Sequence, residues 1–401
     1  MSNEFQQMTE ERRMIQDAAR QFTMERVLPI ANKLDPRKEA IPRDLIDEMA
    51  EMGYFGILIP EEYGGLGLGA FEYCLVAEQL SRGWMSVGSL IARGNGLIGA
   101  LKALTPEMKA KYLPQMAKGE FLGAFSLSEP NAGSDVANIT CRAERVGDEW
   151  RITGSKYWCT FADQADFILV IARTDPKVNP DARHRGLSAF MIEKPRGELP
   201  PNVQGSIIPK IGYHGWTTWE LAFDKCVVPA SCMVGEEGKA FYLATAGLET
   251  ARAHTAARSI GLAQGALEDA IKFAHERVQF GESIASFQAI RFKIADMATQ
   301  IEAARSLMYS VCDKIDQGVR CDTEAAMVKL FASEMSERVT SEGLQIHGGG
   351  GYTTEFAAER YWRDARLTKI FEGTSEIQKR IISDNLLGKP SRRQNKGGGA
   401  A

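Results

Sequence analysis

A long stripe of apolar residues is the feature that most constrains how this chain can fold. Its side chains recur at alternating steps of four and three, at Ile290, Ile294, Met297, Ile301, Ala304, Met308 and Val311. This spacing puts them on one face of a long α-helix, which must bury that face against other helices. Similar segments follow one another to about residue 388. The sequence therefore predicts a C-terminal four-helix bundle over residues 236–388.

Two regions with different residue patterns precede the bundle. Residues 1–120 also show helical spacing and predict an N-terminal helical domain. Residues 121–235 contain short β-rich runs, such as "DFILVIART" and "GLSAFMIEK", bounded by Gly, Pro and Asp. Runs of this kind predict a middle antiparallel β domain. The expected fold class is α+β, with helices, then a β domain, then a helical bundle.

Composition excludes several functional classes. Lys and Arg total 48 against 52 Asp and Glu, a net charge of −4, so there is no electrostatic basis for binding nucleic acid or an anionic membrane. Seven cysteines without a CxxC pair and five histidines without HExxH spacing give no disulfide framework and no metal site. No apolar run could span a bilayer, and the polar start "MSNEFQQMTEERR" is not a signal peptide. We expect a cytoplasmic protein without membrane insertion, and a disordered tail at 389–401, which has almost no apolar residue.

Four segments combine glycines, hydroxyls, arginine or aromatics in patterns that could hold a cofactor. They are "FSLSEPNAGSDVA" (125–137), "GSKYWCT" (154–160), "ERVQFGESIASFQAI" (276–290) and "QIHGGGGY" (345–352). Hydroxyls and free backbone N–H groups suit a phosphate or a polar ring edge, and a forked arginine suits a phosphate. Each segment also has a plain explanation: a turn, a core tryptophan, a solvated arginine beside a helix-terminal phenylalanine, and a glycine-capped helix end. A P-loop and a Rossmann fingerprint are both absent from the sequence.

A fifth segment, "IFEGTSEIQKR" (370–380), holds a glutamate between an aromatic residue and a glycine. Phe371 and Gly373 would leave the Glu372 carboxylate lightly solvated. Desolvation raises a carboxyl pKa toward neutrality, where a glutamate serves well as a general base. Thr374 or Ser375 could at the same time cap the helix that follows.

In this order and over this layout, "SEPNAGSDV", "GSKYWCT", "ERVQFG", "QIHGGGGY" and "FEGTSEIQ" resemble the acyl-CoA dehydrogenase family, along about residues 5 to 388. The resemblance implies FAD between the β domain and the bundle, in a site shared between subunits of a homotetramer arranged as a dimer of dimers. It implies oxidation of an acyl-CoA thioester to the trans-2-enoyl-CoA. Glu372 would take the α-proton, the β-hydride would pass to flavin N5, and an electron-transfer flavoprotein would accept the electrons.

The resemblance also implies roles for residues other than the base. Those that line the flavin, cover its ring or bond its edge are Phe125, Leu127, Ser128, Gly133, Ser134, Trp158 and Thr160. Those that reach the FAD of a neighbouring subunit are Arg277, Phe280, Gln288, Gln345 and Gly349. Thr374 and Glu376 match positions near the adenosine and pyrophosphate, although some members carry Gln in place of Glu376.

Substrate contacts are implied for Ser134, at the thioester, and for Glu249 and Arg252, at the CoA moiety. Some members place the base directly before the arginine that Arg252 matches. Here that residue is Ala251, which cannot act as a base, and this favours Glu372.

The acyl group is less constrained. Arg93, within "SRGWMSVGSLIARGNGLIGA" (81–100), stands where straight-chain members carry an uncharged residue beside the acyl pocket. A buried guanidinium there would need a carboxylate partner. The stretch is similar to the branch that oxidises 2-substituted succinyl-CoA thioesters, such as methylsuccinyl-CoA or benzylsuccinyl-CoA. The alternative is that Arg93 faces solvent or pairs with an acidic residue on a helix.

Other functions stay open at this point. They are a short-chain, medium-chain or branched acyl-CoA dehydrogenase, an acyl-CoA oxidase of the same fold, and a non-catalytic helical scaffold. Non-dehydrogenating relatives, such as desulfinases and nitroalkane oxidases, tend to replace the glutamate, so the presence of Glu372 argues against them.

Overall fold

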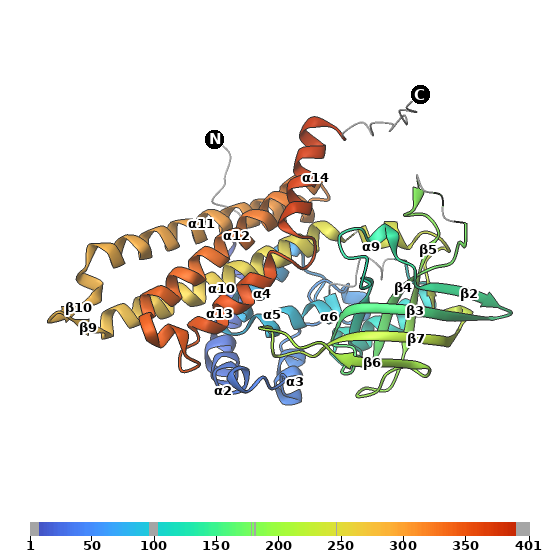
Figure 1. Ribbon diagram of the computed structural model, residues 1–401, viewed down its shortest axis with the longest axis horizontal. Helices are drawn as coiled ribbons and strands as arrows, with labels where there is room; N and C mark the ends of the chain where they lie inside the picture. Colours follow the sequence, from blue (N-terminus) through green and yellow to red (C-terminus); the bar gives the residue numbers. More distant parts are fainter. Residues whose placement is uncertain (1–7, 96–102, 178, 180–181, 246, 390–401) are drawn as a thin grey trace, which may run out of the picture.

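The computed structural model describes residues 8–95, 103–177, 179, 182–245 and 247–389. A helical part and a β part lie side by side along the long axis of the molecule (Figure 1). The helices before the sheet are α1 (Glu10–Phe22), α2 (Leu28–Leu34), α3 (Arg43–Glu51), α4 (Ala70–Gly83), α5 (Met85–Leu90), α6 (Ala92–Asn95) and α8 (Pro106–Ala117). The helices after it are α9 (Ala240–Thr245), α10 (Leu248–Glu276), α11 (Gln288–Asp316), α12 (Asp322–His347), α13 (Ala358–Thr368) and α14 (Ser375–Leu387).

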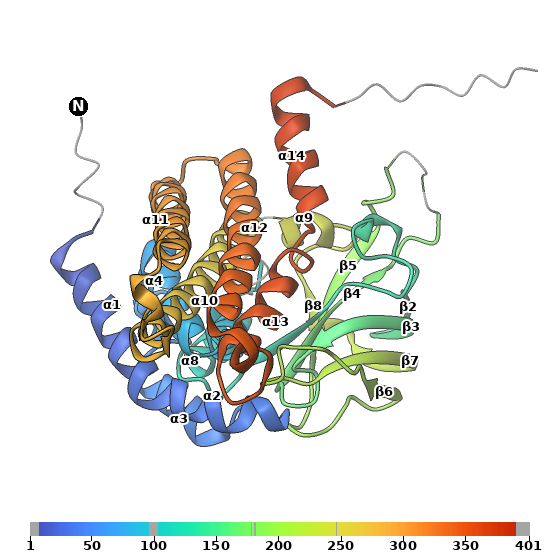
Figure 2. The same cartoon turned by 60° about the vertical axis from the view of Figure 1, so that its left-hand side comes forward.

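Helix α10 is the centre of the helical part. It packs against α4, α11, α12 and α13, so a helix of the N-terminal region joins the C-terminal bundle (Figures 1 and 2). The apolar stripe of α11 faces this core: Met297, Ile301, Ala304, Met308 and Val311 are all buried. The periodicity therefore identified the buried face of α11 correctly.

In the part of the chain that the structure describes, the sheet has eight strands in the order β6-β7-β3-β2-β4-β5-β8, and β1 pairs with β4. Its strands are β1 (Gly123–Ser126), β2 (Arg142–Val146), β3 (Glu149–Thr160), β4 (Phe167–Arg173), β5 (Leu187–Glu193), β6 (Val203–Ile207), β7 (Thr218–Pro229) and β8 (Met233–Val234). Most pairings are antiparallel, as expected, but β1–β4 and β2–β4 are parallel.

Strand β4 is buried on both faces, which explains its continuous apolar run. Ile168 and Val170 face the core shared with the helices, whereas Phe167, Leu169 and Ile171 face a second core that includes α8. Alternate residues of a strand point to opposite faces, so a strand covered on both sides needs apolar residues at every position. This strand ties the sheet to helices on either side.

A buried ion pair anchors the loop that follows β1. Lys156, on β3, is fully buried, and its Nζ donates to Glu129 Oε1 and to the Leu127 carbonyl, each at 2.9 Å. Glu129 also accepts hydrogen bonds from the backbone N–H groups of Thr140 and Cys141. These contacts hold the start of the "SEPNAGSDV" loop against β3, an interior strand of the sheet.

We expect Glu129→Gln to lower the free energy of unfolding by about 3–5 kcal/mol, because it leaves the Lys156 ammonium buried without a counter-charge. Thermal or denaturant unfolding measures this loss. Glu149→Gln, at an exposed position of β3, is the matched control. Equal stability of the two variants would show that the buried pair contributes nothing.

Helix α14 projects from the body of the molecule (Figures 1 and 2). Its last residues, Leu386 and Leu387, are exposed. Apart from Lys389, the expected disordered tail at 389–401 lies outside the described residues. Among the helices that the structure describes, none is long and apolar enough to cross a membrane.

Candidate active site

Glu372 lies in the short loop between α13 and α14. Its φ is +54° and that of Gly373 is +92°, so a residue with a side chain adopts the left-handed conformation that glycine favours. Buried Lys329 of α12 donates from Nζ to the Gly373 carbonyl at 2.6 Å, and Gln378 Nε2 donates to the same oxygen at 3.0 Å. Thr374 caps α14 by accepting from the Ile377 N–H at 3.3 Å, which confirms the predicted cap. The loop is thus held in a strained conformation that points the carboxylate in one direction.

Two side chains of α10 contact the Glu372 carboxylate. Arg258 donates from Nη2 to Oε1 at 2.7 Å, and Thr255 donates from its hydroxyl to Oε2. Arg258 is only 2% exposed, whereas Glu372 remains 36% exposed. Arg258 also donates to Ser89 Oγ at 2.8 Å, and its guanidinium lies over the Phe371 ring at 4.6 Å. One side of the carboxylate is therefore fixed by a buried cation while the other is open.

This arrangement contradicts the expected pKa of Glu372. Burial does raise the pKa of the carboxyl, but the charge of Arg258 and the hydrogen bonds from Thr255 and Arg258 lower it by more. The net pKa of Glu372 lies below its ordinary value, so the carboxylate is ionised at neutral pH. The expectation failed because Phe371 carries a guanidinium on its face and does not simply exclude water.

A stacked pair of polar rings borders the same region. Tyr73 and His254 lie with ring centroids 4.6 Å apart, and His254 Nε2 is 3.1 Å from the Gly88 carbonyl. Burial, followed by the charge of Arg258, lowers the pKa of His254 to about 3, so its imidazole is neutral. Among the residues with described positions, the buried Tyr73 hydroxyl has no hydrogen-bond partner. Arg258, Glu372 and Arg93 all affect the pKa of both rings, so the three charged groups converge here.

Sequence reasoning missed five residues of this region: Tyr73, His254, Thr255, Arg258 and Lys329. A signal was present in "TARAHTAARSIG", where His254 and Arg258 stand four residues apart in an alanine-rich helix. Side chains at that spacing share a face, and a buried face that holds an arginine needs a counter-charge. The partner could not be identified from the helix itself.

Arg93 lies on the short helix α6 and is half-buried. Its guanidinium is 5.6 Å from the centre of the Phe161 ring, and its Nε is buried without a hydrogen-bond partner among the residues that have described positions. Within the same residues, no acidic side chain forms an ion pair with it. An ion pair with an acid on a helix is therefore not seen among these residues, whereas part of the half-buried side chain still faces solvent. Residues 96–100 of the motif lie outside the described part of the chain.

Trp158 and Thr160 lie near the end of β3. A register shift between Lys156 and Cys159 interrupts the pairing with β7, and Trp158 has a φ of +65°. The bulge turns the indole outward, so Trp158 is 55% exposed. The plain explanation of a core tryptophan is therefore wrong. A large exposed ring with a hydroxyl two residues away fits a flat heteroaromatic group with a polar edge, as in the isoalloxazine of FAD.

The residues of the first motif lie near this strand. Phe125, Leu127 and Ser128 are half-buried, and the Ser128 carbonyl accepts from the Tyr157 N–H at 2.8 Å. Gly133 and Ser134 are exposed, and a Cβ added at Gly133 would meet no atom within 4 Å. An open loop of this kind leaves room for a ligand beside the end of β3 that carries Trp158 and Thr160.

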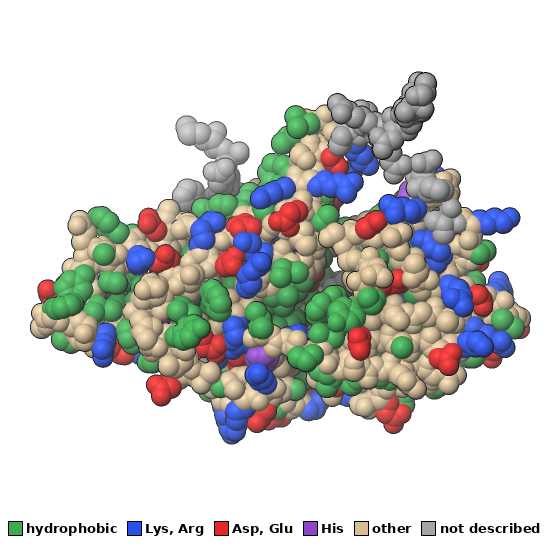
Figure 3. Space-filling view, in the orientation of Figure 1, with side chains coloured by type: hydrophobic (Ala, Val, Ile, Leu, Met, Phe, Trp, Pro, Cys, Tyr) green, Lys and Arg blue, Asp and Glu red, His purple; other side chains and the backbone are tan. Residues whose placement is uncertain are grey.

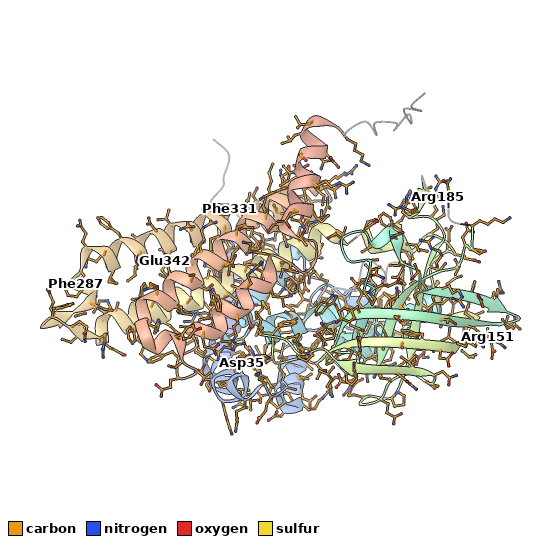
Figure 4. The ribbon with its side chains drawn as sticks, viewed as in Figure 1. Asp35, Arg151, Arg185, Phe287, Phe331 and Glu342 are labelled. Carbon is orange, nitrogen blue, oxygen red and sulfur yellow. The ribbon has the colours of Figure 1, made fainter. Side chains whose placement is uncertain are left out.

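Another group of predicted cofactor residues lies far from Trp158. The strands β9 (Val278–Gln279) and β10 (Glu282–Ser283) form a hairpin at the end of the bundle opposite the sheet. Figure 4 shows Phe287 at that end and Arg151 of β3 at the other. Phe280, in the hairpin turn, is 95% exposed, and apolar side chains gather on this part of the surface (Figure 3). Arg277, Gln288, Gln345 and Gly349 are likewise exposed.

Within one chain, Arg277, Phe280 and Gln288, on or beside this hairpin, therefore do not lie together with Trp158 and Thr160. Exposed Glu376 lies in the first turn of α14, two residues after the cap residue Thr374. Glu249 accepts from the Cys321 N–H at 2.8 Å and so supports the start of α12. Buried Arg252 lies 3.9 Å from Asp322, and its Nη1 makes no hydrogen bond with any described residue. Arg252 thus keeps a donor for an anionic ligand.

Comparison with known proteins agrees with this fold. Family models for the acyl-CoA dehydrogenase N-terminal, middle and C-terminal domains match residues 9–120, 124–226 and 238–387. The chain is 41% identical to (2S)-methylsuccinyl-CoA dehydrogenase of Cereibacter sphaeroides, over 95% of this chain and 70% of that protein. It matches butyryl-CoA dehydrogenase of Megasphaera elsdenii with a TM-score of 0.88 and 35% identity, over 94% of this chain and 98% of the other. A chain from a study of the electron transferring flavoprotein of Acidaminococcus fermentans gives a TM-score of 0.89 at 39% identity, over 95% and 99%.

These matches place the chain in a class of flavin-dependent oxidoreductases. The chain belongs to the acyl-CoA dehydrogenase family, which is FAD-dependent. A glutaryl-CoA dehydrogenase of Mycobacterium smegmatis, solved in complex with FADH2, has the same fold, with a TM-score of 0.87 and 26% identity over 96% of this chain and 97% of that one.

Proposed function

We propose that this enzyme removes the α-proton and the β-hydride from an acyl-CoA thioester to form the trans-2-enoyl-CoA, with Glu372 as the general base. The carboxylate that Arg258 and Thr255 anchor is the observation that carries the proposal. An ionised carboxylate with one open side can accept a proton from a group bound on that side. FAD supplies the hydride acceptor when it is bound, with Trp158 and Thr160 at its ring.

The backbone of the Glu372 loop supports a second role. The Glu372 N–H donates to no acceptor of the residues that the structure describes, although the neighbouring carbonyls are bonded. A fixed and unpaired N–H stabilises a developing oxyanion without reorganisation. We assign this N–H to the thioester oxygen, where it acidifies the α-proton that Glu372 removes.

The acyl group that we propose is a 2-substituted succinyl group, with Arg93 at its distal carboxylate. Arg93 is half-buried and lacks an acidic partner in the described structure, and a second guanidinium, Arg258, lies in the same region. A guanidinium that is removed from solvent is stabilised by a carboxylate. The similarity to a methylsuccinyl-CoA dehydrogenase supports this choice over a fatty or branched monocarboxylic acyl group.

We further propose a homotetramer and an electron-transfer flavoprotein as the electron acceptor. A partner's exposed hairpin would complete the FAD site if Arg277, Phe280 and Gln288 reach across a subunit interface. The match to a chain from a study of an electron transferring flavoprotein supports the acceptor. A high yield of hydrogen peroxide in air would instead indicate an acyl-CoA oxidase.

The substrate proposal predicts a selective effect of Arg93→Ala. We expect kcat/KM for methylsuccinyl-CoA to fall by about 10- to 100-fold, the loss of a charge-assisted contact, with little change for butyryl-CoA. Arg151→Ala, at an exposed position of β3, is the control arginine. Equal losses with both substrates would refute the role of Arg93 at a carboxylate.

A further inference from the structure

A line of hydrogen bonds leads from a lysine to the hydroxyl of Thr160. Thr160 ends β3, and its Cα partner across the sheet is Thr218, the first residue of β7. The two hydroxyl oxygens are 3.1 Å apart. Behind them, Lys210 donates from Nζ to Thr218 Oγ1 at 2.9 Å and to the Trp216 carbonyl at 2.6 Å. The order is therefore Lys210, Thr218, Thr160, and then the open side of the strand end.

The chemistry of these groups fixes which group donates and which accepts in each of these hydrogen bonds. Burial lowers the pKa of Lys210 to about 8, so the ammonium form still prevails at pH 7, and an ammonium can only donate. Thr218 therefore accepts from Lys210. Thr218 is 3% exposed, and its hydroxyl has no other partner among the residues that the structure describes. Its proton is satisfied only by donation to Thr160, because a buried hydroxyl proton without an acceptor is costly.

Thr160 is then an acceptor toward Thr218, and its own proton is free. Its side chain is half-buried and lies at the same strand end as the exposed indole of Trp158. The free O–H is thus available to a group bound beside that indole. With the opposite direction, Thr160 would donate inward and would present only a lone pair to the ligand.

We propose that Lys210 and Thr218 are positioning residues that turn the Thr160 hydroxyl outward, so that it donates a hydrogen bond to an acceptor on the ring edge of FAD. This inference rests on the proposed contact between Thr160 and the flavin. It adds two residues that sequence reasoning did not single out, and neither of them touches the cofactor. Both act through the direction of one hydroxyl proton.

The test compares single and double variants in FAD binding and in the oxidised flavin spectrum, which do not depend on turnover. We expect Thr160→Val, Thr218→Val and Lys210→Met each to weaken FAD binding to the apoprotein by about fivefold, the loss of one hydrogen bond, and to shift the flavin absorption bands. The conservative Thr218→Ser keeps the hydroxyl and should retain both properties. Lys210→Met added to Thr160→Val should cause no further change.

Additive effects of Lys210→Met and Thr160→Val would overturn the proposal that Lys210 acts through Thr160. Lys210 would then only support its loop. A changed spectrum in Thr160→Val together with wild-type behaviour of both Thr218→Val and Lys210→Met would also overturn the proposal. If Lys210→Met fails to fold, the Thr218→Val and Thr218→Ser pair decides the question. A Thr160→Val variant that binds FAD with wild-type affinity and spectrum would overturn the flavin contact itself, and the proposal with it.

Discussion

Glu372→Gln is expected to keep FAD and to lose turnover by about a thousandfold, because the amide cannot accept the α-proton. The substitution preserves the shape of the side chain, and the amide oxygen can still accept a hydrogen bond from Arg258. FAD content is read from the absorbance of the purified protein, and turnover from steady-state oxidation of the acyl-CoA. The loss should appear in kcat, since the base acts in the chemical step and not in substrate binding.

Glu62→Gln is the matched control, because Glu62 is exposed and distant from Glu372 in the sequence, and it should behave as wild type. Near-normal turnover by Glu372→Gln would remove Glu372 from the reaction. Loss of FAD from this variant would instead point to a structural role for the loop, which Lys329 and Gln378 hold.

Arg258→Met should shift the acid limb of the kcat/KM profile to higher pH by about 1 to 3 units. In the wild-type protein, burial raises the pKa of Glu372, and the Arg258 charge, the largest of the opposing effects, helps to bring the net pKa below its ordinary value. Without that charge the effect of burial remains, so the carboxyl binds its proton at higher pH and less of the base is ionised at pH 6 to 7. The pH dependence of kcat/KM measures the shift, and thermal unfolding establishes that the variant folds.

Arg258→Lys is the companion variant for this prediction. It keeps a positive charge but loses the forked contact to Ser89 and Thr255. Its acid limb should lie between those of the wild type and Arg258→Met. An acid limb that stays in place in both variants would show that Arg258 does not control the ionisation of Glu372.

The three-part layout could be predicted from the sequence because periodicity reports burial directly. The apolar stripe of α11 is buried, and the continuous apolar run of β4 is covered on both faces. Glu372 could be singled out because a carboxylate between an aromatic residue and a glycine is locally unusual. The cap at Thr374 also followed from local chemistry alone.

The electrostatics of the base could not be predicted in the same way. Arg258 pairs with Glu372 across 114 residues of sequence, and only tertiary packing brings α10 to the loop after α13. From the neighbouring residues alone, Phe371 is expected to exclude water and so to raise the pKa of Glu372. The structure shows that this predicted direction is wrong. The outward turn of Trp158 depends on a bulge and a positive φ, which no local pattern marked.

The most direct test of the proposed reaction is anaerobic mixing of the FAD-bound enzyme with methylsuccinyl-CoA and, separately, with butyryl-CoA, while the flavin absorbance is followed. We predict rapid bleaching by methylsuccinyl-CoA, much slower bleaching by butyryl-CoA, and no rapid bleaching in Glu372→Gln. Bleaching by butyryl-CoA alone would contradict the role of Arg93 and leave a monocarboxylic acyl group as the substrate. A flavin that stays oxidised with every acyl-CoA tested would contradict the proposed dehydrogenation.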